Sequence, residues 1–223
     1  MEEPTSLSED EDDDPTSLGE DEEGLDNEIA CISDPSELLS EPRTPTSTFV
    51  ARRNALCAKH QTPVLIAAGA PRSRNYGDNT YPFRAMSHFL YFVGASIPSA
   101  VLLLHENRST LFTTPVEEHS DLWEGPVPSY DELKAMHQVD AVRPLNELRA
   151  AIEPFRSSIA LLPTMDSKTC SFLSSCLQRE HEVVPCSGAT LEENSVDAAL
   201  ANAIVELRLR HDSDALKQLR FAA

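Results

Sequence analysis

The amino-acid sequence predicts an α/β domain in which a mixed sheet is flanked by helices. Short apolar runs with strand character alternate along the chain with longer segments whose apolar residues recur at helical spacing. Such alternation is typical of layered α/β domains. A strongly acidic segment with neither pattern precedes the alternating region. The 223 residues therefore suit one ordinary domain with an added tail.

The acidic charge is concentrated at the amino terminus. Residues 1–41 hold 17 of the 37 acidic residues and no Lys or Arg, which leaves 20 acidic and 18 basic residues for the rest. Residues 1–44 also contain too little apolar surface to offset the entropy of ordering, so we expect a disordered acidic tail. The nearly neutral remainder shows no basic face, which argues against nucleic acid as a ligand.

The cellular location is predicted from what the sequence lacks. Five cysteines occur without any C-x-x-C pair, which favours a reducing compartment over a disulfide framework. The first 30 residues show neither a basic start nor an apolar run, as a secretory signal would. Every apolar run is too short to span a bilayer. We therefore expect a cytoplasmic protein with no membrane contact.

The first half of the alternating region predicts two helices and three strands. Phe49, Leu56 and Cys57 share one helical side, and a buried apolar run ends at Gly69. The run 83–93 fits both strand and helix spacing, and we favour a short helix. The expected elements are a helix at 49–60, a strand at 63–69, a polar loop at 71–80, a helix at 87–92, and a hairpin of strands at 100–105 and 110–114.

The second half continues the alternation. Ser129 followed by Glu132 forms a capping-box pattern for one helix, and Asp212 can cap the last. Leu145, Leu148 and Ile152 lie at helical spacing. After the helix that starts at Ser129, the expected elements are a strand at 139–142, a helix at 145–155, a strand at 158–162, a helix at 167–178, a strand at 181–185, and helices at 196–209 and 212–223.

No catalytic motif is present in the sequence. It contains no nucleophile elbow, no H-E-x-x-H pair, no phosphate-binding glycine loop and no dinucleotide fingerprint. His88 lies in an apolar segment and is read as a satisfied core or subsite histidine rather than a metal ligand. The run from Glu117 to His119 imitates a metal cluster, but such polar runs are more often solvated loops. We predict no catalytic and no metal-binding residue in this chain.

Two segments have an unusual composition. Residues 78–94 mix five aromatic residues with Asp78 and Arg84, and the only tryptophan, Trp123, stands beside Glu124 and Gly125. These segments resemble the amino-terminal domain of aminopeptidase P proteins. The matching positions are Asp78, Tyr81, Phe83, Arg84, Ser87, Phe89, Tyr91 and Gly94, then Pro98, Ala100, Leu102 and Leu104, then Trp123–Gly125 and the linker-like Glu206–Asp212 with Leu216. Ala85 and the pair His211–Asp212 depart from that pattern.

The resemblance implies a fold and an activity for the parent enzyme. It implies a mixed sheet flanked by helices, related to creatinase and prolidase, followed by a catalytic domain with a pita-bread fold. That second domain would hold two manganese ions through two Asp, two Glu and one His. A metal-bridged hydroxide would attack the peptide bond before proline. This chain has no counterpart of those ligands, so we expect it to bind no manganese and to be inactive alone.

The resemblance also implies roles for particular residues. Asp78 and Trp123, together with Arg84 and Tyr81, would wall a substrate pocket, including that of a neighbouring subunit in a homo-oligomer that acts on peptides. The alternative is that Asp78 pairs with Arg84 and Trp123 only packs. The expected divisions are an acidic tail at 1–44, the amino-terminal domain at 45–190, and linker helices at 191–223 that lead to the catalytic domain on the same or another chain.

Two other interpretations compete with this one. The chain could be a non-catalytic, peptidase-like binding module whose acidic tail binds basic proteins. It could also be a fragment with no role of its own. Leu216, Leu219 and Phe221 of the last helix have no evident apolar partner in the sequence, which favours a chain that needs a further domain.

Overall fold

Five strands form one mixed sheet in the computed structural model, which describes residues 42–77, 79–115, 125, 127–179 and 195–223. The strands are β1 (Val64–Ala67), β2 (Val101–His105), β3 (Arg108–Thr113), β4 (Ala141–Pro144) and β5 (Ala160–Leu161). Their order across the sheet is β4-β3-β2-β1-β5. β2 pairs antiparallel with both β1 and β3, whereas β4 and β5 pair parallel with their neighbours. The predicted mixed sheet is confirmed.

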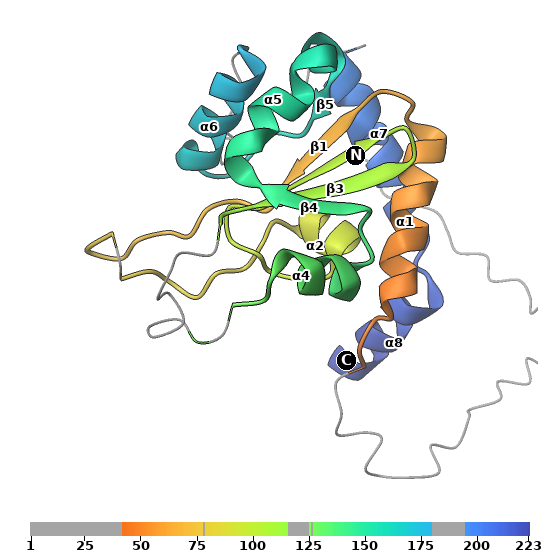
Figure 1. Ribbon diagram of the computed structural model, residues 1–223. Coiled ribbons are helices and arrows are strands. Elements are labelled where there is room, and N and C mark those ends of the chain that lie inside the picture. The colour runs from red at the N-terminus through yellow and green to blue at the C-terminus, as the bar shows by residue number, and fades with distance from the viewer. Residues whose placement is uncertain (1–41, 78, 116–124, 126, 180–194) are drawn as a thin grey trace, which may run out of the picture. The chain divides into compact units, whose positions relative to one another are not determined.

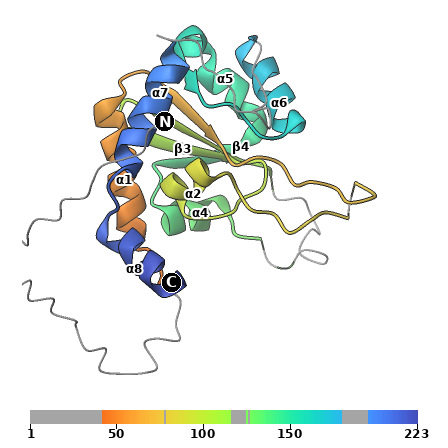
Figure 2. The same cartoon turned by 180° about the vertical axis from the view of Figure 1, so that it is seen from behind.

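Helices cover both faces of this sheet (Figures 1 and 2). On one side lie α5 and α6, and on the other lie α1, α2 and α7. The helices described are α1 (Thr46–Lys59), α2 (Ser87–Val93), α4 (Tyr130–His137), α5 (Leu148–Ile152), α6 (Ser167–Leu177), α7 (Val196–Arg208) and α8 (Ser213–Ala222). None of the helices in these ranges is long and apolar enough to cross a membrane.

The strands bury side chains on both faces because successive residues point to opposite sides of a sheet. Val64 and Ile66 of β1 join a core cluster with α1, α2 and α7. Leu65 and Ala67 join a second cluster with α5 and α6. All four residues of β1 are buried, as expected for a central strand covered on both sides.

The hairpin and the caps follow the sequence closely. Glu106 and Asn107 both have positive φ, of 50° and 58°, as in the tight type I′ turns that connect two hairpin strands. Ser129 accepts from the Glu132 amide while the Glu132 carboxylate accepts from the Ser129 amide, so the predicted capping box is confirmed. The predicted strand at 181–185 lies outside the described residues.

The predicted single helix at 145–155 is wrong in detail. The segment consists of a 3-10 turn at Leu145–Glu147, the short helix α5, and a second 3-10 segment at Glu153–Ser158. Pro154 has no amide hydrogen to continue an α-helix, and Phe155 leaves helical geometry with φ −132°. The amphipathic pattern survives because Leu148 and Ile152 remain fully buried in the second core cluster.

Candidate functional site

Several residues of the first matching segment serve the core of the domain. Phe89 of α2 is fully buried. Gly94 ends α2 in the left-handed region with φ +79°, and an added Cβ would lie 2.3 Å from the Phe49 ring. Ala85, one of the departures from the family pattern, is fully buried, and its amide donates to Ser96 Oγ at 3.2 Å. These positions therefore fix the packing of α2 against α1.

The four predicted pocket-wall residues are only partly described. Asp78 and Trp123 lie outside the described residues. Tyr81 is exposed, and the Arg74 guanidinium stacks 4.7 Å from the centre of its ring. Arg84 is also exposed, and its contacts are with neighbours in the chain, 3.4 Å to Ser87 Oγ and 3.5 Å to the Ala85 carbonyl. The structure does not bring Tyr81 and Arg84 together.

The loop that carries Tyr81 is held by its own backbone. Ser73 and Thr80 form an isolated antiparallel bridge, and the Arg74 amide donates to the Asn79 carbonyl at 2.8 Å. The Tyr81 amide donates to the Arg72 carbonyl at 2.9 Å. These bonds hold Tyr81 at the base of a narrow, outward-reaching turn, with most of its surface in solvent.

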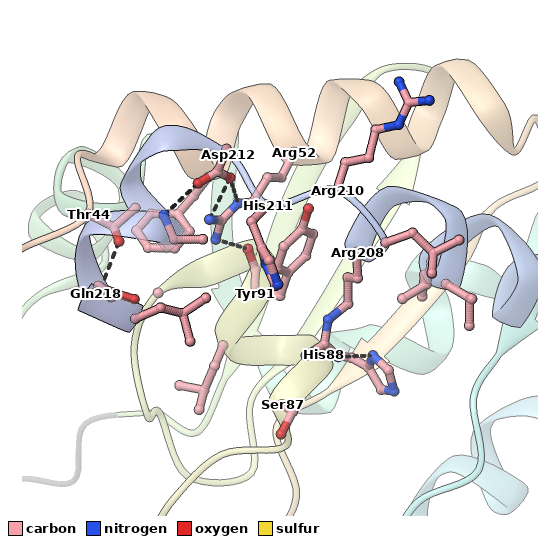
Figure 3. A pocket seen from close by; sticks show the side chains of 18 of the residues that line it. Thr44, Arg52, Ser87, His88, Tyr91, Arg208, Arg210, His211, Asp212 and Gln218 are labelled. Atoms are coloured by element: carbon pink, nitrogen blue, oxygen red, sulfur yellow. Dashed lines mark hydrogen bonds and ion pairs between the residues drawn. The ribbon is translucent and has the colours of Figure 1, made fainter. Parts of the chain in front are cut away.

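A groove of about 1000 Å³ separates α2 from α7 and α8 (Figure 3). Arg52 of α1 closes one end. Its Nε and Nη2 donate to one oxygen of Asp212, at 2.9 and 2.7 Å, and its Nη1 donates to the Tyr91 carbonyl at 3.1 Å. The same guanidinium stacks 4.3 Å from the centre of the Tyr91 ring. Arg52 thus connects α1, α2 and the start of α8.

Asp212 has two roles at that end of the groove. One carboxylate oxygen pairs with Arg52, and the other accepts from the Ala215 amide at 2.8 Å, capping α8. Partial burial raises the pKa of this carboxyl, but the Ala215 amide and the Arg52 guanidinium outweigh that effect and hold the pKa below its usual value. Asp is as good a helix cap as Ser or Thr. The predicted cap is confirmed at a position where the linker departs from the family pattern.

A buried arginine lies one residue further along α1. Arg53 is 2% exposed and donates to three backbone carbonyls, those of Phe92 at 2.8 Å, His137 at 3.0 Å and Gln138 at 2.8 Å. These carbonyls belong to the carboxyl ends of α2 and α4, where helices leave acceptors unpaired. Burial lowers the pKa of Arg53, and the nearby Asp140 carboxylate opposes that shift.

His88 also lies in the groove, where its Nδ1 is 3.4 Å from Arg208 Nη1 (Figure 3). Burial and the neighbouring Arg208 both lower the pKa of His88, so the ring is neutral near pH 7. Across the described ranges, no three His, Cys, Asp or Glu residues come together as a metal site would require. The Glu117–His119 run lies outside those ranges.

Sequence reasoning missed both arginines of α1. The Arg52–Asp212 pair joins residues 160 positions apart, so no local sequence pattern predicts it. Arg53 did leave a signal. It stands four residues after Phe49 and three before Leu56, on the side of the helix that the apolar residues define. A charge on an apolar stripe indicates a buried group with dedicated partners.

The arrangement of a mixed sheet with helices on both faces defines an α/β domain. Residues 49–160 match the family model of the aminopeptidase P N-terminal domain. Since this match covers half of the chain, the chain belongs to that family. The resemblance seen in the sequence is confirmed.

Curated relatives carry a consistent name. A probable Xaa-Pro aminopeptidase PEPP of Leptosphaeria maculans is 32% identical over 117 residues, which are 50% of this chain and 21% of the relative. A second, from Phaeosphaeria nodorum, is 31% identical over 117 residues, or 50% and 25% of the two chains. This chain therefore spans only about a fifth to a quarter of the length of these relatives.

Solved structures agree on the fold. Aminopeptidase P from E. coli with the inhibitor Pro-Leu superposes with a TM-score of 0.53 at 23% identity, over 61% of this chain and 33% of that one. Proline aminopeptidase P II from Yersinia pestis gives 0.50 at 22% identity, over 60% and 32%. At this identity the likeness establishes the fold alone.

Proposed function

We propose that this chain is the amino-terminal domain of a manganese-dependent Xaa-Pro aminopeptidase and is inactive without the catalytic domain. The observation that carries the proposal is the family match across residues 49–160, together with relatives named as Xaa-Pro aminopeptidases. Among the described residues, no cluster of carboxylates and histidines of the kind that holds a manganese pair occurs. The metals, and the hydrolysis they support, belong to a second domain.

The last helix supplies the contact surface for that second domain in this proposal. Leu216, Leu219 and Phe221 of α8 are each exposed by 41% or more, although α8 is anchored at its start by Asp212 and by a 2.6 Å bond from Thr48 to Asp214. An apolar face on an anchored helix is costly in water. We propose that the catalytic domain covers it and that the assembled enzyme is a homo-oligomer.

This proposal is tested on the native gene product. An antibody against residues 1–41 should capture from source cells a protein heavier than 24.6 kDa. The captured protein should release the first residue from an Xaa-Pro peptide with Mn²⁺, and a chelator should abolish that release. Purified 1–223 should release nothing under the same conditions. Capture of an inactive 24.6 kDa protein, or chelator-sensitive turnover by 1–223 itself, would contradict the proposal.

We further propose that Asp78, Tyr81, Arg84 and Trp123 wall the substrate pocket of the assembled enzyme. The exposed position of Tyr81 and Arg84, on and beside a loop braced by its own backbone, supports this role. A carboxylate such as Asp78 suits a free substrate amine, and an indole such as Trp123 limits how far a peptide can extend.

The wall proposal predicts a change in KM in the full-length enzyme. Asp78→Asn should raise KM for Xaa-Pro peptides about tenfold with little change in kcat, because a charge-assisted hydrogen bond to the substrate amine is lost. Asp131→Asn is a matched control, since Asp131 is exposed in the first turn of α4. Equal KM values for the two variants would show that Asp78 does not contact the substrate.

A further inference from the structure

The groove between α2, α7 and α8 has an uncompensated positive charge. Asp212 is the only carboxylate among its described lining residues, and Arg52 already binds it. The remaining charged or titratable residues that line the groove are Arg84, His88, Arg208, Arg210 and His211. Three guanidiniums therefore line the groove without a carboxylate partner among the described residues, in a chain with a formal charge of −19.

Two of these guanidiniums flank the start of α2. Arg84 reaches Ser87 Oγ at 3.4 Å, and Arg208, from the end of α7, reaches His88 Nδ1 at 3.4 Å. Because His88 is neutral, it accepts from Arg208 without compensating its charge. Arg208 also lies 5.6 Å from the centre of the Tyr91 ring, which orients the guanidinium but leaves donors free. The two guanidiniums therefore line the groove from different elements, beside two consecutive residues of α2.

The groove is not purely polar. Val205 of α7, Leu209 directly after that helix and Leu219 of α8 also line it, and each is more than half exposed. Exposed apolar side chains beside unpaired cations match a peptide that carries both apolar and acidic residues.

We propose that this groove binds an acidic peptide segment of a partner protein, with side-chain carboxylates bound by Arg84 and Arg208. A guanidinium presents paired donors that fit the two oxygens of a carboxylate. The apolar residues of the segment cover Val205 and Leu209. The proposal shares Arg84 with the proposed pocket wall, but its test measures binding to the 1–223 chain without the catalytic domain, so the two proposals can fail separately.

The test measures peptide binding to the whole 1–223 chain by calorimetry at physiological salt. The probe is a blocked peptide of sequence LEALEAL, compared with its neutral counterpart LQALQAL and with inorganic phosphate. The glutamate peptide should bind about tenfold more tightly than the glutamine peptide, because charge-assisted hydrogen bonds are lost in the latter. Arg84→Gln and Arg208→Gln should each weaken its binding about tenfold by the same reasoning.

Arg149→Gln is the matched control, since Arg149 is exposed on α5, across the sheet from the groove. It should leave the affinity unchanged, and far-ultraviolet circular dichroism should show that all three variants are folded. The proposal is overturned if the two peptides bind with equal affinity, or if the glutamate peptide does not bind at millimolar concentration. It is also overturned if Arg84→Gln and Arg208→Gln lose no more affinity than Arg149→Gln does. Phosphate that binds and displaces the glutamate peptide at equal concentration would overturn the assignment to a carboxylate.

Discussion

Replacing Arg53 by Met should lower the free energy of unfolding by about 3 kcal/mol, since each buried acceptor left without a donor costs roughly 1–3 kcal/mol. The guanidinium of Arg53 supplies the donors for the Phe92, His137 and Gln138 carbonyls. Met fills a similar volume and donates nothing. The loss should be smaller than the sum of three such costs, because burying the arginine charge itself opposes folding. Urea unfolding followed by circular dichroism measures the change.

Lys59→Met is the control for losing a cation from α1. Lys59 pairs with Glu206 at 2.7 Å, but both side chains are more than two-fifths exposed. A pair of this kind contributes about 0–1 kcal/mol, so this variant should remain close to the parent. Arg53→Lys should recover part of the stability, because an ammonium still donates but cannot span two helix ends. If Arg53→Met unfolds at the same urea concentration as Lys59→Met, the carbonyls find other donors and the assigned role is wrong.

Gly94→Ala should lower the free energy of unfolding by about 3 kcal/mol through two separate effects. An L-residue in the left-handed region costs about 1–2 kcal/mol, and Gly94 has φ +79°. The new methyl would also lie 2.3 Å from the ring of Phe49, which would have to move away from α2. Forced displacement in a packed region typically costs about 1–3 kcal/mol. Thermal or urea unfolding gives the total.

Two other glycines separate these effects. Gly125 shares the φ of +79°, but an added Cβ there would meet no atom of the described residues within 4 Å, so Gly125→Ala should report backbone strain. Gly77 has neither a positive φ nor a close neighbour, and Gly77→Ala should be nearly neutral. Adding Phe49→Leu to Gly94→Ala should relieve the contact and recover stability relative to the sum of the two single changes. If Gly94→Ala lowers the free energy of unfolding no more than Gly125→Ala does, the Phe49 ring moves aside without a loss of stability.

Local patterns predicted most of the fold because they report local physics. The run at Val64–Ala67 is buried on both faces and has the continuous apolar character of a central strand. The caps at Ser129 and Asp212 are satisfied within three residues, so neighbouring sequence suffices to find them. The broken helix after Leu145 escaped prediction because its apolar spacing is helical, while Pro154 acts on hydrogen bonding rather than on spacing.

The candidate site was predicted less completely, because its geometry is made by residues distant in sequence. Arg84 was selected from its motif, but its place in one groove with Arg208 depends on how α7 returns to α2. The exposed apolar face of α8 was anticipated from Leu216, Leu219 and Phe221, and the structure confirms that all three are exposed. The charge balance of the groove could not be anticipated, since it requires knowing that Arg52 already occupies Asp212.

The return of α7 across the sheet also constrains how the chain folds during synthesis. Leu56 of α1 is fully buried in the same core cluster as Leu200 and Ile204 of α7, and β1 pairs with β5 about a hundred residues later. Long-range contacts of this kind form late, and partly folded chains expose apolar surface until they do. A nascent chain that has emerged only as far as residue 160 has no α7 to cover Leu56, so this face of the sheet stays incompletely covered until residues 196–208 have been synthesised.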